Sequence, residues 1–266
     1  MITQFEFKLH SVSPEILSGP VVFPLDQAKT ILKKYRVLAK TMPDEASCWT
    51  LIRKAAPFPF LDPSHHGQPV LILAMAYIGD MQKGEKVFTP LRALGRSIGD
   101  AVGPHPYAAW QAAFDLLLAA GARNYWKSSD FNELNDEVID ILLDAATQLP
   151  SDECEIFTTQ LGGAASRVAG DAMAFPHRST AYTMNIHGRW QSPDVDKSGV
   201  GWVRDLFNKV DEHSTGSVYV NFVPENGEIR KIGPYGANKE RLEEIKGQVD
   251  PKNLFRRNIN IQPSTR

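Results

Sequence analysis

Short runs of β-type residues recur along this chain, with segments of helical spacing between them, and this alternation constrains the fold most strongly. None of the apolar runs approaches the roughly 20 residues needed to cross a bilayer. We therefore expect an α+β domain, built on a largely antiparallel six- or seven-stranded sheet with helices on one face. The expected strands are residues 1–10, 21–25, 47–55, 69–77, 156–163, 180–190 and 217–224.

The segments between the expected strands have the 3.6-residue spacing of apolar side chains that is typical of amphipathic helices. The first is bounded by Asp26, a suitable N-cap, and by Pro43, which cannot continue a helix. A Gly/Pro-rich loop is expected at 95–106, and the last 30 residues or so form a small separate element. The expected helices are residues 26–42, 80–94, 107–119, 131–147, 199–212 and 237–248.

The charge and the cysteines narrow the class of protein. A net charge of −2 and a pI near 6.4 give no electrostatic reason for nucleic acid or an anionic membrane to be a partner. Cys48 and Cys154 are the only cysteines and fit free thiols in a reduced compartment, so we expect a cytoplasmic protein. Residues 1–10 have no signal-peptide apolar region.

Familiar catalytic and cofactor motifs are missing from the sequence. It contains no GxGxxG, GxxxxGK[ST] or GxSxG pattern. The His65-His66 pair stands in a Pro-rich turn without a carboxylate or cysteine at metal-ligand spacing, so no metal site is expected. The residues by themselves therefore indicate no self-contained catalytic set.

Strand parity suggests one polar surface. Asn185 and His187 share a face of the expected strand 180–190, and Tyr219 and Asn221 share a face of 217–224. If the two strands are neighbours, these side chains form a polar, aromatic floor that could orient a substrate. The alternative is that they point to solvent from a one-sided antiparallel sheet.

A specific resemblance begins at the C-terminus. Residues 235–263, YGANKERLEEIKGQVDPKNLFRRNINIQP, resemble the closing segment of berberine-bridge-type enzymes of the vanillyl-alcohol-oxidase superfamily, with its Tyr-Gly-x-Asn, Asp-Pro-x-Asn-x-Phe-Arg and Asn-x-Asn-Ile patterns. Residues 123–129, 161–182 and 219–222 are similar to bacterial members, and 2–10 resembles the strand that leaves the FAD domain. The matching positions are Tyr235, Gly236, Asn238, Arg241, Leu242, Lys246, Asp250, Pro251, Asn253, Phe255, Arg256, Asn258, Asn260 and Ile261.

The resemblance implies a domain layout. Residues 1–20 would be an exit strand and linker from a missing FAD domain, 21–230 the substrate-binding domain, and 231–266 the C-terminal berberine-bridge-type segment. The implied function is the substrate-binding part of an FAD-dependent oxidoreductase that oxidises a small organic substrate by hydride transfer to flavin. This chain alone is expected neither to retain FAD nor to be active. The alternative is a stand-alone, non-catalytic small-molecule-binding or interaction protein.

The resemblance also assigns roles to individual residues. The base in this family is often a tyrosine or an acidic residue on the substrate-domain sheet, and Tyr219 and Tyr182 are the candidates here. Tyr182 has the opposite strand parity to Asn185, so both reach one floor only across a bulge. The remaining candidates are Asn185, His187, Asn221, Tyr125, Trp126 and Lys127 for substrate, and Tyr235, Asn258 and Asn260 for the cofactor.

Purely structural roles are alternatives to some of these assignments. Tyr125 and Trp126 are equally suited to core packing, and Asn258 and Asn260 to capping backbone groups in an irregular tail. The expected partners are a small-molecule substrate and either a separate FAD domain or a second copy of the chain. The substrate, the electron acceptor and the flavin linkage have no signal in the sequence.

Overall fold

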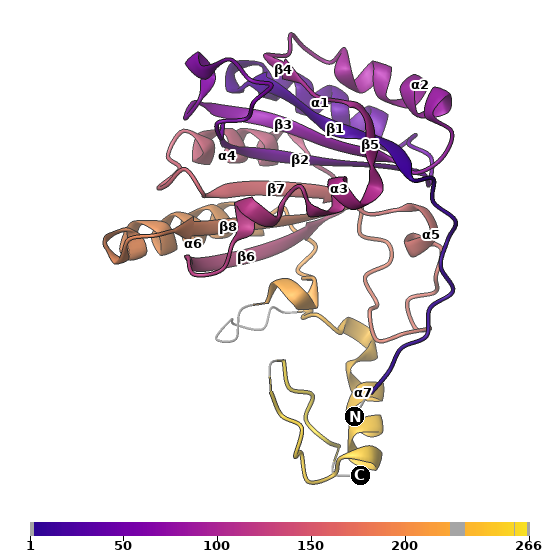
Figure 1. The fold of residues 1–266 in the computed structure, drawn as a ribbon. Coiled ribbons are helices and arrows are strands. Elements are labelled where there is room, and N and C mark those ends of the chain that lie inside the picture. The colour runs from indigo at the N-terminus through magenta and orange to yellow at the C-terminus, as the bar shows by residue number, and fades with distance from the viewer. Residues whose placement is uncertain (1–2, 224–231, 258, 265–266) are drawn as a thin grey trace.

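A computed structural model describes residues 3–223, 232–257 and 259–264, and its centre is one antiparallel sheet (Figure 1). The strand order is β4-β1-β3-β2-β7-β8-β6, and β5 pairs with β1 beside β4. The α+β class and the antiparallel sheet are confirmed. The strands are β1 (Glu15–Pro24), β2 (Ala46–Lys54), β3 (Pro69–Tyr77), β4 (Gly99–Asp100), β5 (Gly103–Pro106), β6 (Arg123–Phe131), β7 (Glu155–Gln160) and β8 (Tyr182–Trp190).

Helices connect most of these strands. The α-helices are α1 (Ala28–Ala39), α2 (Met81–Arg92), α3 (Tyr107–Ala112), α4 (Asp136–Ala146), α5 (Gly163–Ser166), α6 (Asp196–Asp211) and α7 (Lys239–Val249). Short 3-10 helices are η1 (Leu25–Gln27), η2 (Pro63–His65), η3 (Asp115–Leu118), η4 (Pro193–Val195), η5 (Val220–Phe222) and η6 (Gly236–Asn238). No helix in the described part of the chain is long and apolar enough to cross a membrane.

Helices α1, α2, α4 and α6 cover one face of the sheet, which we call the helix face. Alternate residues of each strand enter the core between them because successive strand side chains point to opposite sides. Each fully buried aliphatic or aromatic side chain contributes roughly 1.5–3 kcal/mol. The strand residues of this core include Val21, Phe23, Cys48, Ile52, Leu71, Leu73, Met75, Ile156, Met184 and Ile186.

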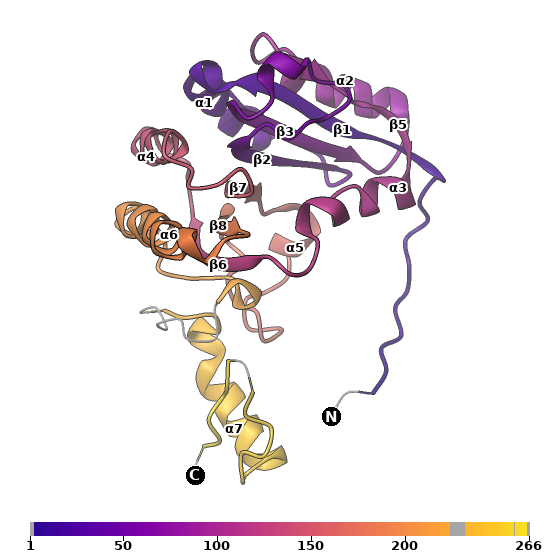
Figure 2. The ribbon, with the colours of Figure 1, turned by 60° about the vertical axis from the view of Figure 1, so that its left-hand side comes forward.

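The opposite face, which carries Trp49, Leu51 and Arg53 on β2, is called the open face. Helix α3 lies on this side, across the sheet from α1, α4 and α6 (Figure 2). Trp110 and Phe114 pack with Phe58 and Phe60 over the β1–β3–β2 part of the sheet. Helices α1, α2, α4 and α6 lie on one face, as the sequence predicted, and the short helix α3 is an addition on the other. Over β7, β8 and β6 the open face instead carries cavities.

Several expected elements differ from the structure. Residues 3–14 are irregular, and β1 begins at Glu15, so the expected boundary at residue 20 falls inside a strand. The loop at 95–106 contains the two short strands β4 and β5, and β6 was not expected at all. The segment at 217–224 is no strand where it is described: residues 220–222 form η5. Its alternating residues mimic a strand pattern.

The C-terminal element lies apart from the sheet (Figure 1), and its motif residues hold a turn. Helix α7 ends at Asp250, whose carboxylate accepts hydrogen bonds from the Lys246 ammonium (2.5 Å) and from the backbone N–H groups of Leu254 (2.9 Å) and Phe255 (3.0 Å). Asn253 adopts a left-handed backbone with φ of 49°, which asparagine tolerates better than most residues. The hydrogen bond from Lys246 is the main reason that the pKa of Asp250 falls to about 2.

Candidate functional site

The open face of β2, β7, β8 and β6 is a grid of facing side chains. The strand registers place each side chain opposite a same-face residue of the next strand, at the close spacing of cross-strand pairs. One row across the grid is mainly charged, the second contains an aromatic ring and an amide, and the third contains hydroxyls. The rows are Arg53–Glu155–His187–Trp126, Leu51–Phe157–Asn185–Ser128 and Trp49–Thr159–Thr183–Asp130.

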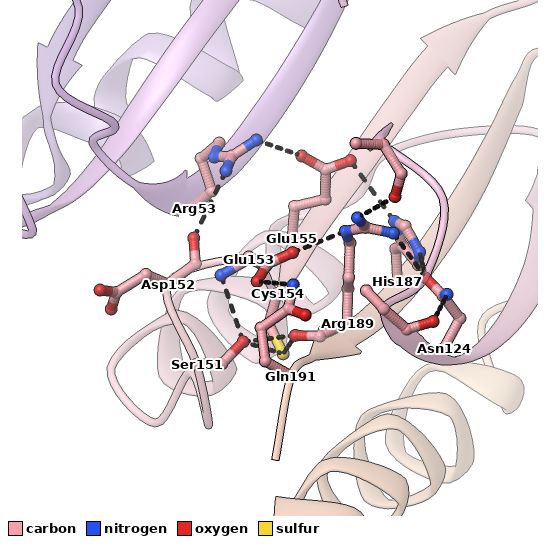
Figure 3. Close-up of polar contacts among 12 residues, drawn as sticks. Arg53, Asn124, Ser151, Asp152, Glu153, Cys154, Glu155, His187, Arg189 and Gln191 are labelled. Atoms are coloured by element: carbon pink, nitrogen blue, oxygen red, sulfur yellow. Dashed lines mark hydrogen bonds and ion pairs between the residues drawn. The ribbon is translucent and has the colours of Figure 1, made fainter. Parts of the chain in front are cut away.

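The first row holds a buried ionic network (Figure 3). Arg53 donates through Nη1 to Glu155 Oε2 at 3.0 Å, and the two side chains are only 8% and 10% exposed. The other carboxylate oxygen of Glu155 lies 3.7 Å from His187 Nδ1. A buried charge pair of this kind is held in place because either charge alone would be poorly solvated.

Asn124 sets the orientation of the His187 ring. Its Oδ1 atom lies 2.9 Å from His187 Nε2 and also accepts a hydrogen bond from Arg189 Nη1 at 3.4 Å, while its Nδ2 donates to the carbonyl of Ala122. Because that oxygen can only accept, His187 Nε2 carries a proton. His187 Nδ1 lies on the side of Glu155 and is the ring nitrogen left for a bound molecule.

One unpartnered polar group lines the cavity above this network. The indole N–H of Trp126 is buried and has no hydrogen-bond partner among the described residues. Trp126 lines a cavity of about 510 Å³ together with Asn185, His187 and Asn221, and Asn185 is 3% exposed. Buried polar groups are normally hydrogen-bonded, so a cavity lined by a free N–H and by amide and imidazole side chains is suited to a polar ligand.

A wall of aromatic side chains divides the open face. Trp49 stacks on Phe157 with centroids 5.7 Å apart, and Phe157 meets Phe222 edge-on at 5.7 Å. Beyond these rings lies a second cavity of about 390 Å³, which Thr183, His177 and Tyr219 help to line. The same three rings line both cavities, so the two are adjacent compartments of one site.

Segment 217–223 brings Tyr219 and Asn221 to the site, although it is not the strand that the sequence suggested. Asn221 Nδ2 donates to the Tyr219 hydroxyl oxygen at 2.8 Å. The Tyr219 ring packs edge-on against Phe222 at 5.2 Å and Phe175 at 6.0 Å. The structure therefore gathers Asn185, His187 and Asn221 at one cavity and Tyr219 at its neighbour.

Tyr182 is placed elsewhere. It lies on the helix face, 3% exposed, in the same core as Tyr35 and Met184. Burial raises the pKa of its hydroxyl, which has no hydrogen-bond partner in the described residues. The expectation that Tyr182 serves as a base is corrected, because a regular strand without a bulge keeps it on the side opposite to Asn185.

The expected substrate-binding residues Tyr125, Trp126 and Lys127 are likewise divided between the two faces of the sheet. Trp126 lies on the open face, but Tyr125 and Lys127 lie on the helix face against α6. The Lys127 ammonium stands 4.2 Å from the centroid of the Phe207 ring, and Arg204 Nε donates to the Tyr125 hydroxyl at 3.3 Å. Tyr125 and Lys127 are therefore corrected to structural contacts.

Tyr235 and Asn260 lie in the C-terminal element and not on the strands of this grid. Tyr235 is half-buried beside η6, and burial raises its pKa. Asn260 has a buried Oδ1 with no partner in the described part of the tail. Asn258 lies outside the described residues. Their roles toward a cofactor remain predictions.

Sequence reasoning missed four residues of the site. Trp49, Arg53 and Phe157 stand in two expected strands, and Glu155 directly precedes the second of these, so the available signal was their alternating positions. A single charged residue at the end of an apolar strand, such as Arg53 or Glu155, does not by itself indicate a functional site. Only the register of β2 with β7 pairs Arg53 with Glu155. No group of three His, Cys, Asp or Glu suited to a metal occurs among the described residues.

The sheet thus has one face covered by helices and one polar, aromatic face that carries cavities. Comparison with known proteins makes this more specific. Residues 218–262 match the family model described as Berberine and berberine like. The chain is 29% identical over 269 residues to an FAD-linked oxidoreductase of Dictyostelium discoideum, covering 99% of this chain and 55% of that protein.

Solved structures agree on the fold. The berberine bridge enzyme of Eschscholzia californica superposes with a TM-score of 0.77 at 17% identity, over 95% of this chain and 55% of that one. A berberine bridge enzyme variant solved with (S)-reticuline gives 0.76 at 17% identity, over 94% and 55%. The chain spans about half the length of these proteins and is similar to the C-terminal portion of berberine-bridge-type FAD-linked oxidoreductases, which confirms the resemblance.

Proposed function

We propose that this chain is the substrate-binding part of an FAD-dependent oxidoreductase that oxidises a small organic molecule on the open face. The observation that carries the proposal is the buried indole N–H of Trp126, which has no partner among the described residues and lines the same cavity as Asn185 above the Arg53–Glu155–His187 network. The helix face is covered by the chain's own helices, whereas the open face over β7 and β8 carries the cavities that a substrate could enter.

The residues present suit a planar, partly polar group above the grid. The Trp49, Phe157 and Phe222 rings offer flat apolar contact, and Trp126 offers a free N–H donor. The sequence contains no phosphate-binding glycine motif, so we propose that a separate FAD domain holds the cofactor. When bound, the flavin supplies the acceptor for a hydride. Tyr235, Asn258 and Asn260 remain the proposed contacts of the tail toward it.

In this proposal the chain's own residues bind the substrate and take its proton. Asn185, His187 and Asn221 hydrogen-bond the polar groups of the substrate, and His187 offers Nδ1 because Nε2 is engaged by Asn124. Tyr219 is the general base that removes the proton from the substrate heteroatom as the neighbouring carbon loses its hydride. The amide of Asn221 donates to the tyrosine oxygen, which fixes the direction of that hydroxyl.

The test joins this chain to the N-terminal part of the Dictyostelium discoideum relative, the part that the chain does not cover. The chimera should purify with flavin and lose its flavin absorption band anaerobically when an oxidisable alcohol, sugar or amine is added. The chain alone should carry no flavin after gel filtration. Flavin bound to the chain alone would contradict the domain assignment, and a flavin-loaded chimera inert to every substrate class would contradict the proposed oxidation.

The free, buried state of Cys48 and Cys154 supports a cytoplasmic location. Burial raises the pKa of the Cys48 thiol to about 12, which keeps it protonated and unreactive.

A further inference from the structure

Helix α3 roofs a third cavity, of about 300 Å³, beside the candidate site. Its floor is the β1–β3–β2 part of the open face, including Ile72 and Leu51, and its walls include Phe60, Trp110 and Phe114. The cavity is partly open to solvent, since Ala109 in its lining is exposed. Ligand sites are typically concave and mostly apolar, so a cavity with this lining is suited to a bound molecule.

The polar side chains of this cavity are already engaged. Arg53 donates to Glu155, to the carbonyl of Asp152 at 3.3 Å and to its neighbour's carbonyl. His105 Nδ1 lies 2.9 Å from the carbonyl oxygen of Ser18. What remains for a bound molecule is the surface of aromatic and aliphatic side chains, and an apolar cavity of this kind excludes water rather than ordering it.

The cavity adjoins the candidate site. Leu51, Arg53, Phe114 and Leu117 line both this cavity and the 510 Å³ cavity that holds Asn185 and His187. The two therefore share a wall, with the charged Arg53–Glu155 pair at the junction. A molecule that reaches from one cavity into the other must change from polar to apolar along its length.

We propose that the substrate is a two-part molecule whose apolar arm, aromatic or branched aliphatic, lies under α3 while its polar, oxidisable end lies at Asn185 and His187. The substrate class rests on the proposed function, whereas the apolar site under α3 does not. Together the two cavities are of the size that holds drug-sized ligands. A small, uniformly polar substrate such as a simple sugar would leave the α3 cavity empty.

The test titrates this chain with the neutral fluorescent probe N-phenylnaphthylamine. Ala109 lines the cavity from α3, whereas Ala112 is exposed on the same helix and does not line it. Ala109→Leu should weaken probe binding by about tenfold or more, the usual effect of removing space for one or two methylene groups. Ala112→Leu, which makes the same change in helix propensity, should bind like the wild type.

A second control addresses other apolar surfaces. Ala165 lines the 390 Å³ cavity, so Ala165→Leu should leave binding unchanged if the probe sits under α3. No binding by the wild type, equal binding by the Ala109 and Ala112 variants, or weakening by Ala165→Leu alone would overturn the proposal. Circular dichroism should show that each variant is folded.

The chimera with the flavin domain tests whether the cavity under α3 holds part of the substrate or is filled by the flavin domain itself. The probe should stay bound in the flavin-loaded chimera and inhibit its turnover, and Ala109→Leu should relieve that inhibition. Probe affinity lost on joining the flavin domain would show that this domain fills the cavity, and would overturn the proposal. Probe binding to the chain alone needs no flavin, so its outcome is independent of whether the chimera oxidises anything.

Discussion

Asp130 on β6 accepts a hydrogen bond from the Ser217 hydroxyl at 2.8 Å, and this bond ties the Tyr219 segment to the edge of the sheet. Asp130 is 1% exposed, and its second carboxylate oxygen accepts from Thr183 at 2.8 Å. The carboxylate is therefore held by hydroxyls from β8 and from segment 217–223. The position of Tyr219 over the open face depends on this side chain on a neighbouring strand.

Ser217→Ala should destabilise the chain by about 1–3 kcal/mol, because Asp130 loses a partner that water does not replace. Urea unfolding gives the free energy. Ser198→Ala is the control, since that side chain is exposed and, among the described residues, its hydroxyl donates to the nearby carbonyl of Val195. Equal stabilities for the two variants would show that Asp130 does not anchor the segment.

The buried pair of Arg53 and Glu155 should show strong coupling. Arg53→Ala and Glu155→Ala should each cost about 3–5 kcal/mol, the range for stranding one charge of a buried pair. The double variant should cost clearly less than the sum. A double-mutant cycle in urea measures this, and additive losses would mean that the two charges act independently. Lys29 and Asp140, an exposed ion pair, provide a control cycle with little coupling.

Tyr219→Phe in the flavin-loaded chimera should lower turnover by roughly 10²–10⁴-fold, the usual contribution of a general base. Substrate affinity should change much less. Tyr182→Phe makes the same chemical change on the helix face and should leave turnover intact. It should also preserve or raise stability, because a buried hydroxyl without a partner is removed. A comparable loss of turnover in both variants would exclude Tyr219 as the base.

The C-terminal turn should depend on pH through Asp250. Its pKa is lowered to about 2, so the ionised carboxylate stabilises the turn above the ordinary carboxyl pKa near 4. This stabilisation is lost as the pH falls toward about 2. Amide NMR shifts of Leu254 and Phe255 should report it. Asp250→Asn should abolish this dependence and Glu240→Gln, exposed on α7, should not.

Exposed apolar side chains in residues 3–14 and in the C-terminal element should make the isolated chain self-associate or bind a separate FAD domain. Phe7, Leu254 and Phe255 are 73%, 73% and 64% exposed, and large exposed apolar groups commonly mark interaction sites. Light scattering should show concentration-dependent association that a Leu254→Ser/Phe255→Ser variant reduces. Val37→Ser removes a side chain 63% exposed on α1 and should have no effect. A monomer at all concentrations that also ignores the FAD domain would contradict this prediction.

The sequence predicted the positions of individual strands better than the pairing between strands. The apolar alternation of 47–55 and 69–77 identified β2 and β3 almost to the residue, because their helix-face side chains fill a packed core. Strand β6 was missed because its residues are mixed in polarity, and its place depends on β8, far away in the sequence. Segment 217–223 shows the opposite error, because a strand was predicted where none forms. The segment has alternating residues, but a hydrogen bond to Asp130 holds it instead of a neighbouring strand.

The candidate site was likewise only partly predictable. Parity grouped Asn185 with His187 correctly, because any strand sends alternate residues to one side. Arg53 and Glu155 required the register between β2 and β7, which sequence periodicity cannot provide. The cavity under α3 required the position of a helix on the open face, and local patterns do not say which face a helix covers.

The place of β6 at the sheet edge has a consequence for how the chain folds. Among the described strands, β6 pairs only with β8, whose residues 182–190 are synthesised long after residues 123–131. On the ribosome, β1, β2 and β3 can pair with one another as soon as they emerge, whereas β6 must wait with its backbone groups unpaired. Because distant pairings form slowly and unpaired strands are prone to aggregate, the pairing of β6 with β8 is expected to be a late and vulnerable step in folding.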